Sequence, residues 1–419
     1  MPTERLYYDD SYTTRFRAPI VRREMRGERP ALELASTYFY PESGGQEADR
    51  GLLGPWDVVD VQADEEGSVW HVIAPVVRGD APATSGPSGA VATSFPEPAG
   101  AGDEVEGEID WARRFDHMQQ HTGQHILSAA FERVLGAATL SSHLGEERSS
   151  IEVALADIDW RTIERLEDAA NGIVWRDVPV ERHWVDDAGV RKFKLRKPPK
   201  FTGRIRIVEI PEWDVSACGG THTRRTGEIG AIKIVRWEKL RGNLRFEFLC
   251  GARALRDHAW RTEALLESAR RRTLKDRELI AHLERAATER DELKKQVREL
   301  TERVTAAEAA ERVGTPPRGV AALKPSWARE TVRTFAIKCL EAGAPWVVAA
   351  AAGPEPVVIG GRAKQGAVNL RDAVPELLAV AQGKGGGSPD LVQAAAADAA
   401  HAEAAFHWLT RWIGERLGA

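Results

Sequence analysis

The alternation of hydrophobic and polar residues predicts a β-rich beginning of the chain. Residues 56–61 (WDVVDV) and 67–74 (GSVWHVIA) are short and rich in β-branched and aromatic residues, with turn-forming residues between them. This pattern is typical of neighbouring strands. Residues 79–103 hold many Gly, Pro, Ala and Ser residues, which favours a flexible loop beside these strands. We therefore expect a β-barrel-like domain over residues 1–105.

Helical and strand periods are mixed in the next part of the chain. Residues 118–134 carry apolar residues at helical spacing and no proline, which predicts a helix over 117–135. A second helix is predicted over 160–176. Shorter segments rich in β-branched residues predict strands at 150–155, 204–210, 231–235 and 244–249. This mixture indicates an α+β domain over residues 106–255.

Residues 256–312 contain neither glycine nor proline, and Ala, Glu, Arg and Leu dominate. The apolar residues alternate spacings of four and three, which is the seam of a coiled coil; they are Leu293, Val297, Leu300, Val304 and Ala307. We predict a long helical linker over 256–313 that ends at Gly314. It either folds back as a hairpin or forms the stalk of a homodimer.

The last part, residues 314–419, is predicted to be an α/β domain. Apolar segments at 346–352 and 356–360 predict buried strands, and helices are expected over 369–381 and 389–417. A glycine-rich loop is predicted just before the last helix; its residues are Lys384, Gly385, Gly386 and Gly387. Its amides, the lysine charge and the helix N-terminus would suit a phosphate. An ordinary tight turn is the alternative. This domain is also a candidate for pairing two copies of the chain.

Composition describes a globular protein of several domains. The chain has 419 residues, of which 42% are hydrophobic and 29% charged, with a net charge of −5; this length suggests two to four domains. No run of 18 uncharged apolar residues is present, so we expect no membrane span. The N-terminus has no basic-then-apolar signal. The three cysteines do not form a disulfide framework, which favours a reducing cytoplasm.

One basic cluster stands out against the weakly acidic average. The run 191–206 (RKFKLRKPPKFTGRIR) contains eight Lys or Arg residues and no acid. Such a run either lies in solvent as a charged loop or binds phosphates. The candidates for phosphate binding are Lys192, Lys194, Arg196 and Lys197, because the run leads directly towards a second unusual segment.

That segment is CGGTH at 218–222, and it pairs with HTGQH at 121–125. On a helix, the spacing of His121 and His125 places both imidazoles on one face. Cys218 and His222 flank a Gly-Gly pair that favours a tight loop. Three imidazoles and one thiolate form a plausible tetrahedral zinc set, either structural or catalytic. The alternative is that each pair is a coincidence. Position 122 is threonine, so the glutamate of the protease motif His-Glu-x-x-His is absent, which argues against a peptidase.

These ligand pairs resemble those in the editing domain of alanyl-tRNA synthetases and of the free-standing alanyl-tRNA editing proteins. The resemblance extends to several further segments. Those of the N-terminal and editing regions are FYPESGGQ at 39–46, DRG at 49–51, GEIDWARR at 107–114, TGEIG at 226–230 and RFEFLCGARA at 245–254. Near the C-terminus, GKGGGSPD at 383–390 with Gln393 resembles the signature of the DHHA1 domain.

The resemblance implies a zinc-dependent hydrolase that removes serine, or glycine, from mischarged alanine tRNA. It places a substrate-reading hydroxyl at Thr122, although threonine often bonds its own helix instead. His143 would face the ester or a water, or else be a surface histidine. Asp116 and Asp214 are the nearest carboxylates in sequence, suited either to act as a base or to orient a ligand histidine. The loop of Gly44, Gly45 and Gln46 would lie against the pocket and the tRNA end; a plain turn is the alternative.

Two other functions compete with this hydrolase. A zinc-stabilised RNA-binding protein without turnover would use the same ligands as a closed structural site. A phosphoesterase is suggested only by the DHHA1-like segment, and the Asp-His-His motif of that class is absent. Aminoacyl-tRNA synthesis is not expected, because the chain begins directly with the predicted barrel.

Overall fold

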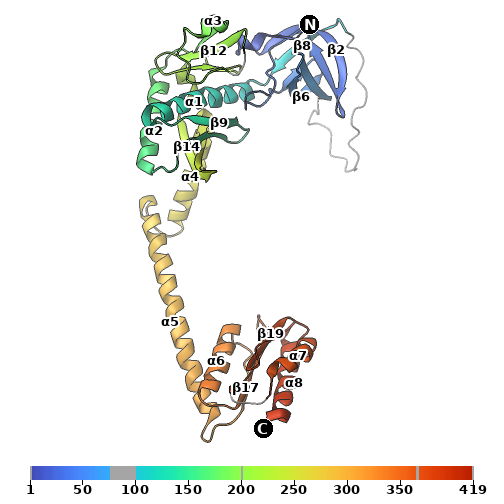
Figure 1. The fold of residues 1–419 in the computed structure, drawn as a ribbon, viewed down its shortest axis with the longest axis vertical. Helices are drawn as coiled ribbons and strands as arrows, with labels where there is room; N and C mark the ends of the chain where they lie inside the picture. Colours follow the sequence, from blue (N-terminus) through green and yellow to red (C-terminus); the bar gives the residue numbers. More distant parts are fainter. Residues whose placement is uncertain (1, 76–100, 200–201, 365–367, 418–419) are drawn as a thin grey trace. The chain divides into compact units, whose positions relative to one another are not determined.

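The computed structural model describes residues 2–75, 101–199, 202–364 and 368–417. It divides into two compact units, Met1–Glu267 and Ser268–Ala419, which Figure 1 shows in blue to yellow and in orange to red. This division is coarser than the four predicted domains, whose limits stay predictions. Most of the loop predicted at 79–103 lies outside the described residues.

The N-terminal part is a closed barrel of six strands in the order β2-β3-β7-β6-β5-β8, with every neighbouring pair antiparallel. The strands are β2 (Arg15–Arg26), β3 (Arg29–Leu34), β5 (Gly51–Leu53), β6 (Trp56–Ala63), β7 (Val69–Pro75) and β8 (Glu104–Ile109). Alternate residues point inward, so Ile20, Leu32 and Val61 fill the interior. Closure leaves no open edge. The predicted β-barrel-like fold of this part is confirmed.

The remainder of the first unit is built around one long helix, α1 (Trp111–Leu135). A four-stranded sheet, β14-β15-β10-β9, and a three-stranded sheet, β11-β12-β13, accompany it. Their strands are β9 (Thr139–Leu144), β10 (Ser149–Val153), β11 (Glu181–Val185), β12 (Ile205–Ile210), β13 (Asp214–Ala217), β14 (Ile232–Leu240) and β15 (Asn243–Cys250). A second helix, α2 (Trp160–Arg176), follows β10. The predicted α+β mixture is confirmed.

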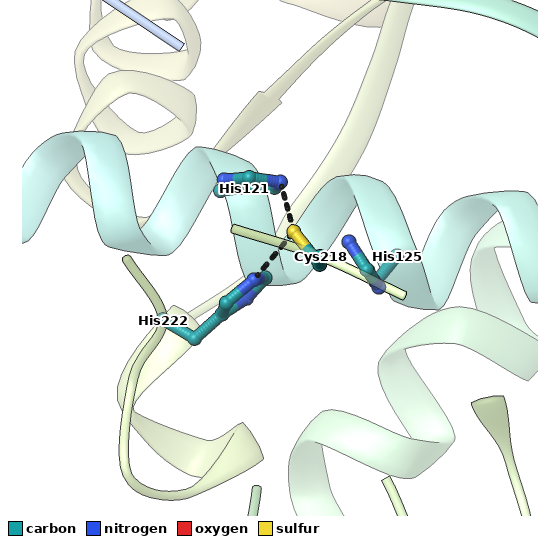
Figure 2. A group of neighbouring side chains, drawn as sticks. All are labelled: His121, His125, Cys218 and His222. Atoms are coloured by element: carbon teal, nitrogen blue, oxygen red, sulfur yellow. Dashed lines mark hydrogen bonds between the residues drawn. The ribbon is translucent and has the colours of Figure 1, made fainter. Parts of the chain in front are cut away.

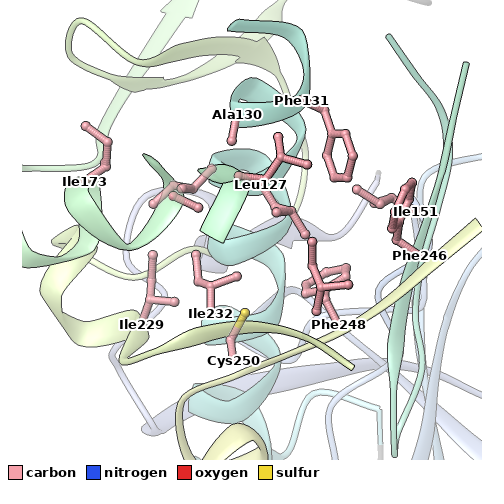
Figure 3. Packing of buried hydrophobic residues seen from close by; sticks show 14 of the residues in the cluster. Leu127, Ala130, Phe131, Ile151, Ile173, Ile229, Ile232, Phe246, Phe248 and Cys250 are labelled. Carbon is pink, nitrogen blue, oxygen red and sulfur yellow. The ribbon is translucent and has the colours of Figure 1, made fainter. Parts of the chain in front are cut away.

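Packing buries the middle of α1 on nearly every side. Leu127 and Phe131 pack against Ile151, Phe246 and Phe248 from the four-stranded sheet (Figure 3). Every residue from 117 to 131 on α1 is buried. Its polar side chains in this stretch therefore need partners inside the protein, because an unpaired buried polar group is costly. This requirement shapes the candidate site described below.

The second unit contains a five-stranded sheet in the order β16-β17-β18-β20-β19. Only the β16–β17 pair is parallel. The strands are β16 (Val320–Leu323), β17 (Trp346–Ala351), β18 (Val357–Arg362), β19 (Gly385–Gly387) and β20 (Leu391–Ala395). The helices are α5 (Leu279–Val313), α6 (Arg329–Glu341), α7 (Val374–Ala381) and α8 (Ala399–Leu417). α6 and the end of α5 cover one face of the sheet, whereas α7 and α8 cover the other.

Two predictions about the second half are wrong. The stretch 256–312 is not one helix, because α4 (Gly251–Arg270) and α5 are separate. Between them, Thr273 adopts a left-handed φ of +56°, which an α-helix does not contain. The segment 389–417 is not wholly helical either. Its first part is strand β20, and the glycines at 385–387 form edge strand β19 beside it. No helix N-terminus follows the glycines directly.

None of the helices in the described part of the chain combines the length and the apolar character of a membrane span.

Candidate metal centre

The four predicted metal ligands meet at one place (Figure 2). His121 and His125 project from neighbouring turns of α1, and Cys218 and His222 come from the loop after β13. One potential ligand atom from each side chain lies within 4.8 Å of all the others. The Cys218 Sγ lies 3.3 Å from Nε2 of His121 and 3.3 Å from Nε2 of His222. The arrangement gathers three imidazoles around one sulfur, as a tetrahedral ion would require.

A carboxylate fixes the orientation of His125. Its Nδ1 lies 2.9 Å from Oδ2 of Asp214. A carboxylate only accepts hydrogen bonds, so Nδ1 carries a proton and Nε2 is the nitrogen left to face a metal. Asp214 is itself held by Arg196 Nε at 2.7 Å and by the Ser216 hydroxyl at 3.0 Å. Burial opposes the charge on Asp214, but His125 and Arg196 outweigh it and lower the pKa of that carboxyl. Burial alone would lower the pKa of His125, whereas Asp214 and Cys218 raise it to about 9.

An amide from the barrel domain fixes His121. Its Nδ1 lies 2.8 Å from Oε1 of Gln46. The same oxygen accepts the backbone N–H of Thr221 at 3.2 Å, and the Gln46 amide nitrogen donates to the Thr221 hydroxyl at 2.8 Å. Because the backbone N–H can only donate, the atom facing His121 is the carbonyl oxygen. His121 therefore donates from Nδ1 and presents the Nε2 lone pair to the centre.

The hydroxyl of Thr122 fixes His222. It lies 3.2 Å from Nδ1 of His222, donates to the carbonyl of Met118 at 2.9 Å and accepts the N–H of Thr223 at 3.1 Å. A hydroxyl has one donor and two acceptor positions. With the proton given to Met118, Nδ1 of His222 must donate, and its Nε2 lone pair also faces the centre. All three histidines thus share the tautomer that binds a metal through Nε2.

The Cys218 loop approaches α1 too closely for any side chain at Gly220. A Cβ built there would lie 2.1 Å from Cε1 of His121. Arg206 secures the loop by donating from Nη1 to the carbonyls of Cys218 and Gly220, both at 2.9 Å. Arg182 donates to the carbonyl of His222 at 3.0 Å. Burial would raise the pKa of the Cys218 thiol, but the neighbouring His121 and His222 lower it, which favours the thiolate that binds metals.

The centre is buried on the helix side and less deeply buried at the loop. His121, His125 and His222 are at most 5% exposed, whereas Cys218 is half-buried and Gly219 is exposed. The loop is therefore the side of the centre that lies nearer the protein surface.

The loop at 44–46 joins the barrel to this centre. The carbonyl of Gly45 accepts the N–H of Leu144 in β9 at 2.8 Å. Gly45 has a φ of +85°, and a Cβ there would lie 2.9 Å from the carbonyl of Ser142. The loop is thus docked on β9, and Gln46 reaches the metal centre from it. His143, between these contacts, is exposed; among the described residues, no hydrogen bond joins it to the four ligands.

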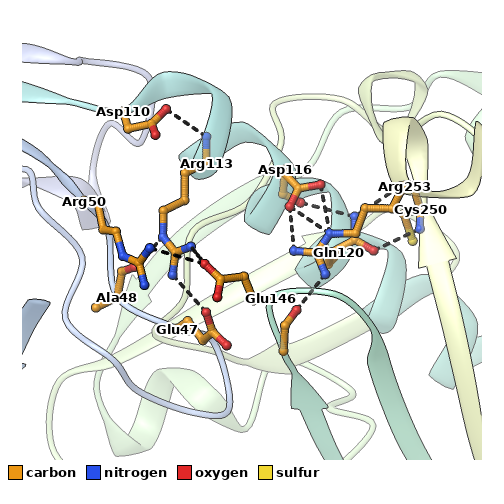
Figure 4. Close-up of polar contacts among 11 residues, drawn as sticks. Glu47, Ala48, Arg50, Asp110, Arg113, Asp116, Gln120, Glu146, Cys250 and Arg253 are labelled. Atoms are coloured by element: carbon orange, nitrogen blue, oxygen red, sulfur yellow. Dashed lines mark hydrogen bonds and ion pairs between the residues drawn. The ribbon is translucent and has the colours of Figure 1, made fainter. Parts of the chain in front are cut away.

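Two arginines form ion pairs that link the loop at 44–46, α1 and the end of β9 (Figure 4). Arg113 on α1 pairs with Glu47 at 2.8 Å and with Glu146 at 2.7 Å. Arg253 at the start of α4 pairs with Asp116 and donates to the carbonyl of Gly145 at 2.6 Å. Asp116 is thus committed to an ion pair with Arg253, and among the described residues no hydrogen bond joins it to a ligand histidine. The junction holds the loop at 44–46, α1 and the end of β9 as one body.

The remaining predicted site residues are placed as follows. Lys192, Lys194 and Lys197 are exposed. Arg196 differs, since its side chain is only 11% exposed and holds Asp214. Lys384 is exposed in the second unit, beside strand β19. Sequence reasoning did not single out Arg182 or Arg206; the only signal for Arg206 was its place in the basic run.

Comparisons with known proteins identify the family. The family model described as "Threonyl and Alanyl tRNA synthetase second additional domain" matches residues 205–246, which include Cys218 and His222. The alanyl-tRNA editing protein AlaX-L of Pyrococcus horikoshii is 30% identical over 407 residues, covering 93% of this chain and 94% of that protein. The chain belongs to the alanyl-tRNA editing protein family. The predicted membership is confirmed.

The chain is also similar to part of larger enzymes, the alanine–tRNA ligases. The alanine–tRNA ligase of Methanopyrus kandleri is 38% identical over 280 residues, which are 63% of this chain and 28% of the ligase. That of Pyrobaculum neutrophilum is 36% identical over 327 residues, which are 73% of this chain and 32% of the ligase. The chain thus spans about a third of these ligases or less.

Proposed function

We propose that this editing protein hydrolyses the aminoacyl ester of alanine tRNA that carries serine, with glycine as a second substrate, and that it uses zinc. The observation that carries the proposal is the ligand group of His121, His125, Cys218 and His222 in a member of the editing family. The partner is therefore mischarged alanine tRNA.

The donor set fits zinc. Three imidazoles, each with Nδ1 held by an outer partner, and one thiolate are ligands that zinc binds well. Magnesium and calcium prefer oxygen ligands, which the group lacks. When bound there, zinc would polarise the ester carbonyl, lower the pKa of a water, or hold the amino group of the substrate.

The protein's own residues orient the centre and admit the ester. Asp214, Gln46 and Thr122 hold the histidines, and the exposed Gly219 marks the side from which the ester enters. The oxygens of Asp214 already accept from His125, Arg196 and Ser216, so we assign Asp214 a positioning role and not that of a base. His143, exposed on β9, is retained as a candidate contact to the ester or a water.

Other contacts to tRNA extend the proposal beyond the centre. The exposed lysines at 192, 194 and 197 would meet phosphates, and Gly44 and Gly45 would lie beside the tRNA end. In the second unit, which we propose to be a DHHA1-like domain, Lys384 with Gly385, Gly386 and Gly387 would hold a remote part of the tRNA.

The exposed apolar residues of α5 support a pairing of two chains. Leu293, Val297, Leu300 and Val304 are each more than half exposed and keep coiled-coil spacing. We propose that a second copy of the chain covers them in a homodimer.

One comparison of variants separates hydrolysis from mere RNA binding. His125→Ala removes a ligand, and His407→Ala, an exposed histidine on α8, is the matched control. The proposal expects serine release from Ser-tRNA(Ala) to be lost in His125→Ala and kept in the control, while tRNA binding persists in both. A wild-type protein that binds this tRNA tightly but releases no serine would instead support a non-catalytic, zinc-stabilised RNA-binding protein.

A further inference from the structure

Arginine and aromatic side chains share one face of the β11–β12 pair, beside the metal-ligand loop. Trp184 lies directly opposite Arg206 across the two antiparallel strands, and strand alternation places Arg182 on the same face. The guanidinium of Arg204 lies over the Trp184 ring at 4.3 Å from its centroid. Tyr8 contacts Trp184 edge-on, with ring centroids 5.5 Å apart. We call these five residues the arginine–aromatic face.

The arginine–aromatic face is continuous with the ligand loop of the metal centre. Its two inner arginines bond alternate carbonyls of the ligand loop: Arg206 bonds those of Cys218 and Gly220, and Arg182 bonds that of His222. Tyr8 reaches the exposed Gly219, since a Cβ built on that glycine would lie 3.6 Å from the tyrosine hydroxyl. A ligand that enters past Gly219 therefore meets this face next.

The arginines of the face form no close ion pair within the described residues. Neither Arg182, Arg204 nor Arg206 lies within ion-pair distance of a described carboxylate, although other arginines of this unit do. Arg206 is only 4% exposed, and its Nη2, like Nε of Arg182, is buried without a hydrogen-bond partner among the described residues. Leaving a buried donor without a hydrogen-bond partner costs stability. These unpaired donors lie beside the metal-ligand loop, where an anionic ligand would accept hydrogen bonds from them.

The outer half of the face suits a nucleobase. Arg204 is exposed, so the outer side of its guanidinium plane is open while its inner side covers Trp184. The indole N–H of Trp184 donates to Asp9 at 3.2 Å, which fixes the ring. Proteins bind single-stranded RNA by stacking bases on aromatic rings or arginine planes and by placing positive charge along the phosphates.

We propose that the arginine–aromatic face binds the single-stranded nucleotide that precedes the terminal nucleoside of the tRNA. Its base stacks on the Arg204–Trp184 pair, and its phosphate lies in the positive field of Arg182, Arg204 and Arg206. This inference rests on the proposed function, because that function places the terminal ester at the metal centre. The inference adds the route by which the 3′ end of the tRNA reaches the metal centre. It also gives a reason why buried arginines hold the ligand loop.

The test compares two substrates that differ only in this nucleotide and the RNA before it. One is a seryl minihelix with its full single-stranded end; the other is the seryl ester of adenosine. For Trp184→Ala and Arg204→Gln, we expect the ratio of kcat/KM for the minihelix to that for the adenosine ester to fall by about tenfold, the effect of losing one base-stacking contact. The matched controls Trp175→Ala and Arg161→Gln, exposed residues on α2, should keep the wild-type ratio.

Each outcome decides one of the two proposals. An unchanged ratio in Arg204→Gln at wild-type zinc content overturns the inference and leaves the proposed function intact; this exposed variant decides the matter if Trp184→Ala does not fold. A wild-type protein that hydrolyses neither substrate overturns the proposed function. The face is then tested by binding of the trinucleotide cytidine–cytidine–adenosine, where equal affinity of the wild type and Arg204→Gln overturns the inference as well.

Discussion

The hydroxyl oxygen of Thr122 lies 3.2 Å from Nδ1 of His222. This hydroxyl also bonds Met118 and Thr223, so its single proton and both lone pairs are in use. In the structure Thr122 therefore orients a ligand histidine. Its predicted role in reading the serine hydroxyl stays a prediction, which needs one of these three bonds to be released.

Replacing Thr122 by Val separates the two roles. Loss of the outer partner of His222 should weaken zinc binding by about 10- to 100-fold, as for other outer-sphere partners of metal ligands. The preference for Ser-tRNA over Ala-tRNA should change little once the protein is saturated with zinc. Competition with a fluorescent chelator measures the affinity. A selective gain of Ala-tRNA hydrolysis at full zinc occupancy would restore the substrate-reading role.

The two neighbouring glycines of the ligand loop should respond differently to alanine. In Gly220→Ala, the new Cβ would lie 2.1 Å from the His121 ring, so that histidine must move and most bound zinc should be lost. In Gly219→Ala, the nearest atom is 3.6 Å away, an ordinary contact, and zinc should be retained. Metal analysis of the two purified variants tests this. Equal zinc content would show that the loop does not hold the His121 ring as described.

Stability of the barrel should fall in mild acid because of His71. This fully buried side chain bonds Leu32 and Thr37, and burial lowers its pKa to about 4. As the pH falls, the unfolded chain, whose histidine pKa is about 6.5, takes up a proton before the folded chain does. The stabilising contribution of neutral His71 is therefore present above pH 6.5 and is lost as the pH falls towards 4. Between pH 7 and pH 5 the loss is about 2 kcal/mol. Hydrogen exchange of the β3 and β7 amides reports it. A His71→Gln variant with the same pH dependence would rule out His71 as the cause.

Removing the exposed charges of the basic run should weaken tRNA binding without loss of metal. We expect Lys192→Gln, Lys194→Gln and Lys197→Gln together to lower the affinity and to reduce the salt dependence, since fewer counterions are displaced. Arg196 is left intact because it holds Asp214. The slope of log affinity against log salt concentration is the measurement. An unchanged slope would place the tRNA elsewhere on the protein.

The spacing of residues within short segments was enough to predict the two ligand pairs. The pair His121–His125 and the pair Cys218–His222 each lie within one short segment, and the sequence predicted that all four side chains would meet, as they do. Their outer partners were harder to find, because Gln46 lies 75 residues from His121 and Asp214 lies 89 residues from His125. No periodicity links such distant residues. Thr122 lies beside His121 in sequence, yet its bond to His222 needs the fold of the loop.

The errors in the second half have similar causes. Thr273 interrupts the long helix in a left-handed conformation where neither glycine nor proline signals a break. The alanine-rich start of the last predicted helix is strand β20, because pairing with β18 and β19 outweighs the helical preference of alanine. Backbone pairing with distant strands cannot be read from one short segment.

The central claim is that this editing protein cleaves the ester at the four-ligand centre, and zinc titration of the stripped protein tests it most directly. The rate of serine release from Ser-tRNA(Ala) is measured while zinc is added back to chelator-treated protein. The account predicts almost no release without metal and a linear rise that ends at one zinc per chain. Full activity of the stripped protein, or no activity at one zinc per chain, would contradict it.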